Sequence, residues 1–402
     1  NYKIRLQNNF KLTNKADIAK LVANAEKLDS VDQPVDNPSI PAAPSIGSGP
    51  DPLLKDQWGM KDIGADEAWK TTTGNADLVV AVIDTGVDYT HEDLLPNMWR
   101  NPGESGVDAQ GRDRETNGID DDGNGFIDDV VGWDFAVNDS KPFDMTVPPM
   151  ELLMGGGNPG HGTHCAGNVA ARGDNGIGIA GVAPNVKIMA LRFLTEKGQG
   201  STEGAIESIK YAVDNGAKIL SNSWGSEGES PDYEEANQAL RDAIQYAQDH
   251  GVLFIAAAGN GHQGVGYDND NDERPAYPAS YIHDIIVSVA AIDANDDFGG
   301  FSNWGSISTD LAAPGVKVFS TTVGSNYSDT VFDKFGITVY WDGTSMATPH
   351  VAGAAALYWS RHPEKSWQEV KAALLNSTVK VPQLRGKLVS EGKLNVENLL
   401  KH

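Results

Sequence analysis

Apolar runs alternate along the chain with segments in which apolar residues recur at helical spacing. The apolar runs, which are rich in β-branched residues, predict buried parallel strands, and the periodic segments predict helices. The runs are residues 78–84, 218–225, 252–260 and 284–293, and the periodic segments are residues 161–171, 202–216, 233–251 and 344–362. Because strands and helices alternate, we expect the α/β class, a three-layer αβα sandwich around a mostly parallel, doubly wound central sheet.

The first fifty residues differ in composition from the rest. Residues 12–28 carry apolar side chains at helical spacing, beginning with the start signal Thr13-Asn14. Residues 32–52 are dominated by proline, serine and glycine, which predicts a linker or an extended arm. We therefore place a boundary near residue 50, between an N-terminal extension at residues 1–50 and one large domain at residues 51–402.

The chain is strongly acidic, with a formal net charge of -25 over 402 residues. Binding of nucleic acid needs basic patches, so the charge argues against that class of partner. Plain solubility explains most of the charge, but clustered carboxylates also favour bound cations. The one cysteine, Cys165, allows no disulfide within the chain, which makes calcium the candidate stabiliser. No apolar run approaches the ~20 residues of a membrane helix, so we expect no membrane partner.

Three side chains suited to nucleophilic catalysis occur at the ends of predicted elements. Asp84 closes an apolar strand, and His161 opens a helix after a glycine-rich segment. Ser345 lies in the first turn of a helix, where backbone N–H groups favour a developing negative charge. Taken singly, each has a plainer explanation: a turn aspartate, a structural histidine and an N-cap serine.

Two other mechanisms share parts of these motifs. Asp84-Thr85-Gly86 is also found in aspartic proteases, but that mechanism needs two such motifs and the chain has one. His161 and His164 have a spacing that suggests zinc, but no glutamate lies between them as it does in a metalloprotease helix.

The three side chains follow one another in the order Asp84, His161, Ser345, which is the order of subtilisin and differs from that of chymotrypsin and the α/β-hydrolases. From about Asp51 to Leu400 the chain resembles the subtilase family, and its motifs are similar to those of thermitase-like and proteinase K-like members. The resemblance implies a secreted serine endopeptidase that hydrolyses protein or peptide substrates through an acyl-enzyme on Ser345. His161 would be the general base, and Asp84 would orient it.

The resemblance also implies the remaining residues of the site. Asn260, at the end of a strand, would donate a hydrogen bond to the oxyanion beside the N–H of Ser345. Two segments would pair with the main chain of an extended substrate, and others would line the pocket for the side chain before the cut bond. These substrate-binding residues are Gly198, Gly200, Ser223, Trp224, Gly225, Ala258, Gly259 and Ala276.

Residues 120–129 have the spacing of an EF-hand-type calcium loop, although the twelfth position is Val131 and not glutamate. An acidic loop without metal is the alternative, but repulsion between so many carboxylates favours calcium. The expected ligands are Asp120, Asp122, Asn124, Phe126 and Asp128. The resemblance implies two further sites for structural Ca²⁺. Their ligands would be Asp51, Asp93, Gly173, Asn175, Ile177 and Ile179 at one site, and Asp134 and Asp139 at the other.

Residues from about 100 to 158 exceed the minimal family pattern, so we expect an insertion that holds the acidic loop. The resemblance makes the chain a zymogen whose own propeptide can act as inhibitor, with residues 1–50 as an N-terminal extension or a propeptide remnant, and we expect a monomer. A pseudoprotease that binds peptides without cutting them is disfavoured by the intact set of catalytic residues. A specialised processing or macrocyclising enzyme would need a narrowed site or added domains. Turnover of denatured casein separates these functions.

Overall fold

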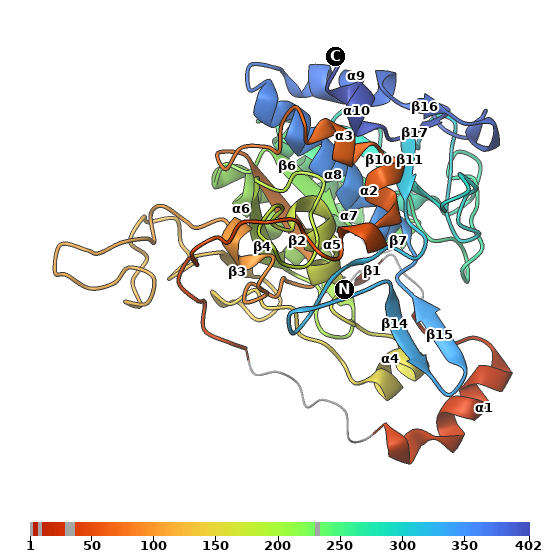
Figure 1. Cartoon of the computed structure of the whole chain (residues 1–402), viewed down its shortest axis with the longest axis horizontal. Coiled ribbons are helices and arrows are strands. Elements are labelled where there is room, and N and C mark those ends of the chain that lie inside the picture. The colour runs from red at the N-terminus through yellow and green to blue at the C-terminus, as the bar shows by residue number, and fades with distance from the viewer. Residues whose placement is uncertain (1–2, 7–9, 29–36, 230–233) are drawn as a thin grey trace.

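A nine-stranded sheet forms the centre of the protein (Figure 1). The structure is a computed structural model, and it describes residues 3–6, 10–28, 37–229 and 234–402. Along the sheet the strands are β16 (Val379–Lys380), β17 (Gly392–Lys393), β11 (Leu311–Pro314), β10 (Ile286–Ile292), β8 (Leu253–Ala257), β6 (Ile219–Asn222), β2 (Val79–Asp84), β4 (Lys187–Arg192) and β3 (Gly132–Asp134). All neighbours run parallel except β16 and β17. The predicted α/β class with a mostly parallel sheet is confirmed.

β2 lies between two parallel neighbours, β4 and β6, and each of its six residues is buried. Its β-branched side chains suit a strand that is covered on both faces. The strand ends at Asp84, at the carboxyl edge of the sheet. In an open parallel sheet this edge is where ligands bind, so the fold itself brings Asp84 to the functional side of the molecule.

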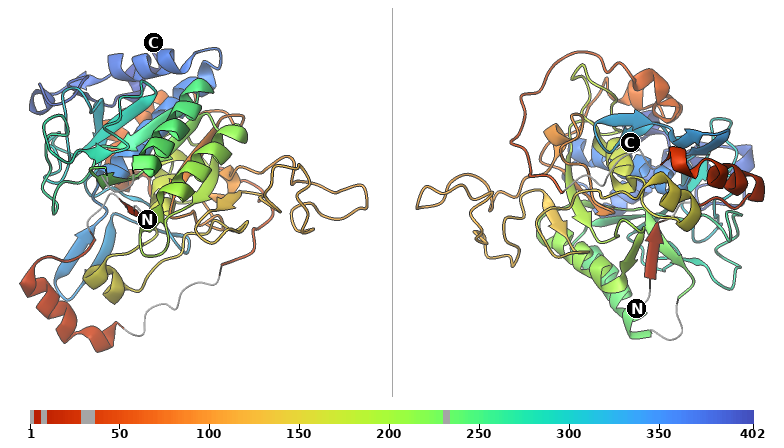
Figure 2. Two further views of the ribbon diagram at one scale, coloured as in Figure 1. Left: turned by 180° about the vertical axis from the view of Figure 1, so that it is seen from behind. Right: turned by 90° about the horizontal axis from the view of Figure 1, so that it is seen from below.

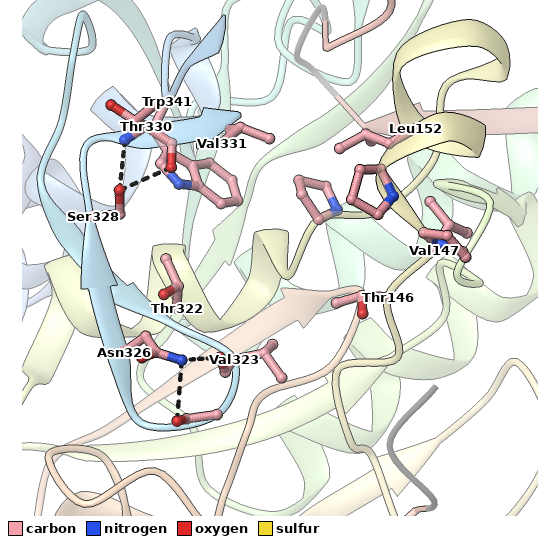
Figure 3. Close-up of a pocket in the computed structure, with 14 residues that line it drawn as sticks. Thr146, Val147, Leu152, Thr322, Val323, Asn326, Ser328, Thr330, Val331 and Trp341 are labelled. Atoms are coloured by element: carbon pink, nitrogen blue, oxygen red, sulfur yellow. Dashed lines mark hydrogen bonds between the residues drawn. The ribbon is translucent and has the colours of Figure 1, made fainter. Parts of the chain in front are cut away.

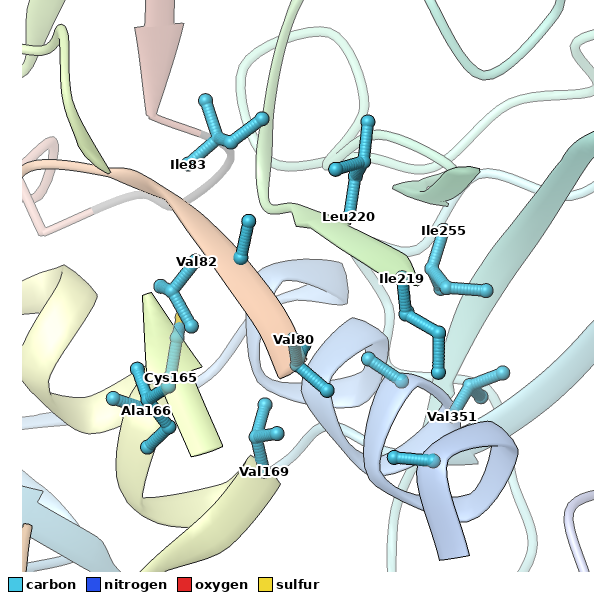
Figure 4. Packing of buried hydrophobic residues seen from close by; sticks show 14 of the residues in the cluster. Val80, Val82, Ile83, Cys165, Ala166, Val169, Ile219, Leu220, Ile255 and Val351 are labelled. Atoms are coloured by element: carbon cyan, nitrogen blue, oxygen red, sulfur yellow. The ribbon is translucent and has the colours of Figure 1, made fainter. Parts of the chain in front are cut away.

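Four long helices cover the two faces of the sheet: α5 (His161–Ala170), α8 (Thr344–Arg361), α6 (Thr202–Asp214) and α7 (Glu234–Asp249). α5 and α8 pack together on one face, while α6 and α7 form a second pair (Figure 2). In Figure 4, Val80 and Val82 of β2 point toward Val169 of α5 and Val351 of α8, whereas Ile83 lies on the other side of the strand. All four predicted helices are present, with α6 ending two residues early, before Gly216 at φ +85°.

The predicted strand at residues 218–225 is wrong in one respect, because it divides at Ser223. β6 belongs to the central sheet, while β7 (Trp224–Glu227) belongs to a separate four-stranded sheet. Between them, the Ser223 carbonyl accepts a hydrogen bond from the Ser345 hydroxyl, and the Ser223 hydroxyl donates one to the Ser345 carbonyl. Ser223 is therefore tied to α8 rather than to a neighbouring strand.

The four-stranded sheet has the order β5 (Gln199–Ser201), β1 (Lys3–Leu6), β7, β9 (Ala276–Tyr277). Two small antiparallel pairs complete the strands: β12 (Ser320–Thr322) with β13 (Asn326–Ser328), and β14 (Thr330–Lys334) with β15 (Ile337–Tyr340). The shorter helices are α1 (Lys15–Ala23), α2 (Trp58–Asp62), α3 (Ala65–Ala68), α4 (Pro149–Gly155), α9 (Trp367–Asn376) and α10 (Val396–Leu399). Single 3₁₀ turns are η1 (Ala25–Lys27), η2 (Leu54–Asp56), η3 (Leu95–Asn97) and η4 (Pro382–Leu384).

The N-terminal part is more structured than its composition indicates. The helix predicted at residues 12–28 is present as the shorter α1, which begins after Asn14, whose side chain accepts hydrogen bonds from the amides of Ala16 and Asp17. β1 is an additional strand that the pattern did not predict. Within the described part of the chain, no helix combines the length and the apolar character needed to cross a membrane.

Candidate active site

Asp84 and His161 face each other from β2 and α5. Their side chains form a hydrogen bond of 2.7 Å between His161 Nδ1 and Asp84 Oδ1, and both residues are fully buried. A close backbone approach permits this contact: a Cβ on Gly162 would lie 1.9 Å from the carbonyl oxygen of Gly86. Glycine at position 162 therefore lets the first turn of α5 pack directly against the end of β2.

The charge on Asp84 governs the protonation of His161. Burial opposes the charged imidazolium, but the adjacent Asp84 carboxylate outweighs this effect and raises the pKa of His161 well above its usual range. The other ring nitrogen, Nε2, has no hydrogen-bond partner among the described residues. The ring is thus held at Nδ1, and Nε2 is the nitrogen available to exchange a proton.

Asp144 supports this pair, and the sequence analysis did not identify it. Its buried carboxylate accepts hydrogen bonds from the hydroxyls of Thr85 and Thr163, the amide of Thr163 and the side chain of Asn158. Thr85 follows Asp84, and Thr163 lies in the first turn of α5, so one carboxylate ties the two elements together. Burial raises the pKa of Asp144 to about 6. Its sequence context, an isolated aspartate in a loop, carries no recognisable signal.

Ser345 is the second residue of α8, after the helix N-cap Gly343. It is fully buried, and its hydroxyl donates to the Ser223 carbonyl at 3.1 Å. The N-terminus of an 18-residue helix directs a partial positive charge at this point. The backbone around Ser345 is thus suited to a negative charge on an oxygen bound beside it.

Asn260 lies next to the start of the same helix. Its side-chain oxygen accepts hydrogen bonds from the Thr344 amide at 2.9 Å and from the Thr344 hydroxyl at 2.8 Å. Both bonds engage the oxygen, so they fix the orientation of the side-chain amide and leave its NH₂ group on the opposite side. The preceding residue, Gly259, has φ +110°, and a Cβ there would meet Asn303 and Ala276 at 2.6 and 2.8 Å. Only glycine fits at this position.

The predicted pocket residues come together around a buried asparagine, Asn269. Its side chain donates to the carbonyl of Ala258 and accepts from the backbone amide of Ala276 and from the side chain of Asn303. No sequence motif marks this structural role of Asn269. Asn269 fixes Ala258 and Ala276 relative to each other, while Gly259 lies against Ala276.

The two predicted substrate-pairing segments are strands β5 and β7, and they enclose β1 of the same chain. β1 runs antiparallel to both, with Ile4 opposite Gly200 and Leu6 opposite Trp224. The amide of Leu6 also donates to the carbonyl of Gly198 at 3.1 Å. The main-chain groups of both segments are therefore arranged to hold an extended peptide as a middle strand.

Of the predicted metal ligands, the set around Asp51, Asp93 and Asn175 is brought together. Asp51 accepts hydrogen bonds from the amides of Asp174 and Asn175, and Asp93 accepts from the Asn175 side chain and the Ile179 amide. Burial raises the pKa of Asp93 to about 7. Gly173 and Ile177 belong to the same loop as Asn175 and Ile179, and that their carbonyls bind calcium stays a prediction.

The acidic loop is arranged differently from an EF-hand. Asp120 accepts from the amides of residues 123–125, and Asp128 accepts from the amide of Gly118, so both carboxylates stabilise the loop itself. The carboxylates that converge are those of Glu104, Asp122 and Asp129, whose oxygens lie within 4.8 Å of one another. Asp129 and Glu104 were not among the expected ligands, and Glu104 lies 16 residues before Asp120 in the sequence. That calcium binds through Asp120, Asn124, Phe126 and Asp128 stays a prediction.

At the third expected calcium site, Asp134 forms an ion pair with an arginine. The buried carboxylate of Asp134 forms an ion pair of 2.6 Å with Arg192, and its other oxygen accepts from the amides of Ala136 and Val137. Asp139 pairs with Asp134 through the main chain. A calcium ion at Asp134 and Asp139 stays a prediction, and Arg192 already supplies a positive charge there.

Comparisons with known proteins agree with this geometry. Residues 75–397 match the model of the subtilase family. Thermitase from Thermoactinomyces vulgaris is 34% identical over 346 residues, which are 86% of this chain and 96% of thermitase. The thermophilic serine proteinase of Bacillus sp. (strain AK1) is 32% identical over 346 residues, which are 86% of this chain and 67% of that protein. Subtilisin DY from Bacillus licheniformis is 36% identical over 238 residues, 59% of this chain and 76% of its own length. With a buried Asp–His pair, a serine at a helix start and this similarity along most of its length, the chain belongs to the subtilase family of serine endopeptidases.

Proposed function

We propose that this protein cuts peptide bonds of polypeptide substrates through an acyl-enzyme on Ser345, with His161 as base and Asp84 as its partner. The observation that carries the proposal is the buried 2.7 Å bond between His161 Nδ1 and Asp84, together with Ser345 at the start of α8. In the first step the Ser345 hydroxyl breaks its hydrogen bond to the Ser223 carbonyl. Its proton goes to His161 Nε2, and its oxygen attacks the carbonyl carbon of the substrate. His161 then passes the proton to the leaving amine, and water repeats the sequence to release the acid.

The tetrahedral intermediate carries a negative oxygen that needs hydrogen-bond donors. We assign this role to the amide of Ser345 at the helix start and to the side-chain NH₂ group of Asn260. Thr344 fixes the orientation of Asn260, so the donor is in place before the charge develops.

Replacing Asn260 with alanine should lower kcat by about 10²–10³-fold, with KM for a short peptide little changed, because the lost bond forms mainly in the transition state. Steady-state kinetics on a peptide p-nitroanilide, with the N-terminal segment released from the cleft, would measure both constants. Asn271→Ala, in the loop behind the pocket, is a matched control that should retain activity. A rise in KM with unchanged kcat would show that Asn260 only binds substrate.

We further propose that residues 3–6 restrain the enzyme in the manner of a propeptide. β1 fills the space between β5 and β7, where the substrate main chain would pair, and its side chains at Ile4 and Leu6 are buried. A substrate cannot form the same hydrogen bonds while β1 is present. This supports a zymogen whose N-terminal segment must leave the cleft before polypeptides can enter.

We propose that structural calcium binds in two places. At the first, Asp51, Asp93 and Asn175 offer side-chain oxygens, and the 173–179 loop offers carbonyls, which is the hard oxygen donor set that Ca²⁺ prefers. At the second, one oxygen of the fully buried Glu104 has no hydrogen-bond partner among the described residues, and it lies with Asp122 and Asp129. A divalent cation would balance the repulsion among these three carboxylates. Neither set of ligands includes a catalytic residue, so the ions would stabilise the fold.

Removal of calcium tests this assignment and the enzymatic function together. Once its N-terminal segment has left the cleft, the protein should digest denatured casein, and a serine-directed fluorophosphonate should stop it. Excess EDTA should cause a slow loss of activity that follows unfolding, since ion binding at 100 times its dissociation constant stabilises the folded state by about 2.7 kcal/mol. Immediate loss of activity with the fold intact would instead indicate a catalytic metal.

Glu104→Gln should lower the thermal unfolding midpoint in calcium and reduce the further drop caused by EDTA. Glu273→Gln, an exposed change outside the cluster, serves as the control and should behave like wild type. If Glu104→Gln responds to EDTA as strongly as wild type, the cluster does not bind calcium. Secretion and action on extracellular proteins are the setting we propose, in keeping with calcium as the stabiliser of a chain with one cysteine.

A further inference from the structure

Two arms of the chain project beyond the central sheet on the side where β1 ends. One is α4 with the preceding residues 145–148, and the other is the β14–β15 hairpin (Figures 1 and 2). Between them lies a cavity of about 430 Å³, in which Val147 and Leu152 face Val331 and Trp341 (Figure 3). Val323 also lines this cavity and lies close to the residue before His161. A Cβ on that residue, Gly160, would lie 2.8 Å from Val323, so the cavity adjoins the start of α5.

Residues 10–28 of the chain are docked on these arms. The amide of Leu12 donates to the carbonyl of Leu153 in α4, and Lys20 Nζ donates to the carbonyl of Gly336 at the hairpin tip. Leu21 of α1 and Leu28 are buried with Leu153, Phe332 and Ile337 in an apolar cluster that is separate from the main core. Without residues 10–28, this cluster would lose two of its five buried side chains.

β1 and the docked segment contact different residues around the catalytic centre. Leu6 is paired with Trp224 and with the Gly198 carbonyl, on the β5 and β7 side. Phe10 packs edge-on against Trp341, with ring centroids 5.2 Å apart, and Trp341 stacks on His164 of α5. The chain thus contacts the β5 and β7 side through Leu6 and the Trp341 side through Phe10.

We propose that α4 and the β14–β15 hairpin form a docking surface for the chain's own residues 10–28, and that this contact is a second block, separate from β1. The inference rests on the proposed function, since it assigns the part of the groove that follows the cut bond. β1 excludes the substrate residues before that bond. The docked residues 10–28 exclude those after it, so opening one side leaves the other closed.

Two substrates report on the two sides separately. A tripeptide p-nitroanilide has no residue beyond the aniline and needs only the β5 and β7 side, whereas denatured casein must cross both. The full chain is prepared with Ile4→Asp, which puts a carboxylate at a buried position of β1 and opens the first side. Leu21→Asp is then added to undock α1, and Val22→Asp, at a position 57% exposed on the same helix, is the matched control.

Ile4→Asp alone should release hydrolysis of the anilide while casein turnover stays low. Adding Leu21→Asp should raise kcat/KM for casein by about tenfold or more, the equivalent of undoing one well-buried contact, and leave the anilide unchanged. Val22→Asp should change neither. A synthetic peptide of residues 10–28, added to the double variant, should again inhibit casein cleavage but not anilide cleavage, which shows that the variant retains its fold.

The proposed second block would be wrong if Leu21→Asp changed the cleavage rates of casein and the anilide equally. It would also be wrong if Leu21→Asp left casein cleavage unchanged while the anilide was cleaved. In both cases the proposed function would stand. Failure of every variant to cleave the anilide, with no fluorophosphonate label on Ser345, would overturn the proposed function and this inference with it.

Discussion

Replacing Ser345 with alanine is expected to lower the rate of peptide-bond hydrolysis by about 10⁶-fold, the size known for removing the nucleophile of subtilisin itself. The substitution removes the only atom that forms the acyl bond, and neither the Asp84–His161 pair nor Asn260 can replace it. The fold should persist, because loss of the hydrogen bond from the hydroxyl to the Ser223 carbonyl costs about 1 kcal/mol. Burst kinetics with an active ester, or turnover of the p-nitroanilide, would measure the loss in the Ile4→Asp background, where the cleft is open.

Ser360→Ala is the matched control for this experiment. It makes the same substitution in the same helix, where the hydroxyl of Ser360 donates to the carbonyl of Ala356 away from the site. Its activity should equal that of wild type. Residual turnover by Ser345→Ala within about tenfold of wild type would rule out the acyl-enzyme mechanism and direct attention to another nucleophile.

Asp84→Asn is expected to lower kcat by about 10⁴-fold, because an amide next to Nδ1 no longer holds the tautomer in which Nε2 accepts the proton. It should also move the pH dependence. In the wild type, the Asp84 carboxylate outweighs burial and raises the pKa of His161 above the usual 6.5. The base acts only when neutral, so activity should rise with pH through that raised value.

Without the carboxylate, burial remains and favours the neutral ring, so the acidic limb of kcat/KM should shift to lower pH in Asp84→Asn. The same linkage bears on stability. A histidine whose pKa is raised by folding contributes stability that is complete below pH 6.5 and lost as the pH rises through the raised pKa. Asp84→Asn should remove that contribution. An acidic limb at the same pH in both proteins would show that Asp84 does not control the protonation of His161.

Much of the fold was predictable because local pattern and tertiary structure agree. β2 is apolar throughout and is buried throughout, and the periodic segments became α5, α6, α7 and α8. Where the pattern failed, a long-range contact was responsible. The segment at residues 218–225 reads as one strand, but the reciprocal hydrogen bonds between Ser223 and Ser345, 122 residues apart, divide it.

The supporting residues of the site were not predictable in the same way. Asp144 and Asn269 stand alone in loops, and their roles arise from partners on other elements: Thr85 and Thr163 for the first, Ala258 and Ala276 for the second. The acidic loop shows the same effect. Its spacing indicated ligands next to one another in sequence, whereas the converging carboxylates include Glu104, which the sequence places outside the loop.

The sequence by itself determined the α/β class, the order of Asp84, His161 and Ser345, and thereby the family. These features are local. Apolar runs indicate the strands, periodic segments indicate the helices, and the small residues next to each functional side chain make its motif recognisable in the sequence. Only the tertiary structure decided that β1 occupies the cleft between β5 and β7 and that residues 10–28 dock on α4 and the β14–β15 hairpin. Strand pairing and apolar contact between segments more than 100 residues apart depend on geometry across the folded molecule, and no local pattern encodes it.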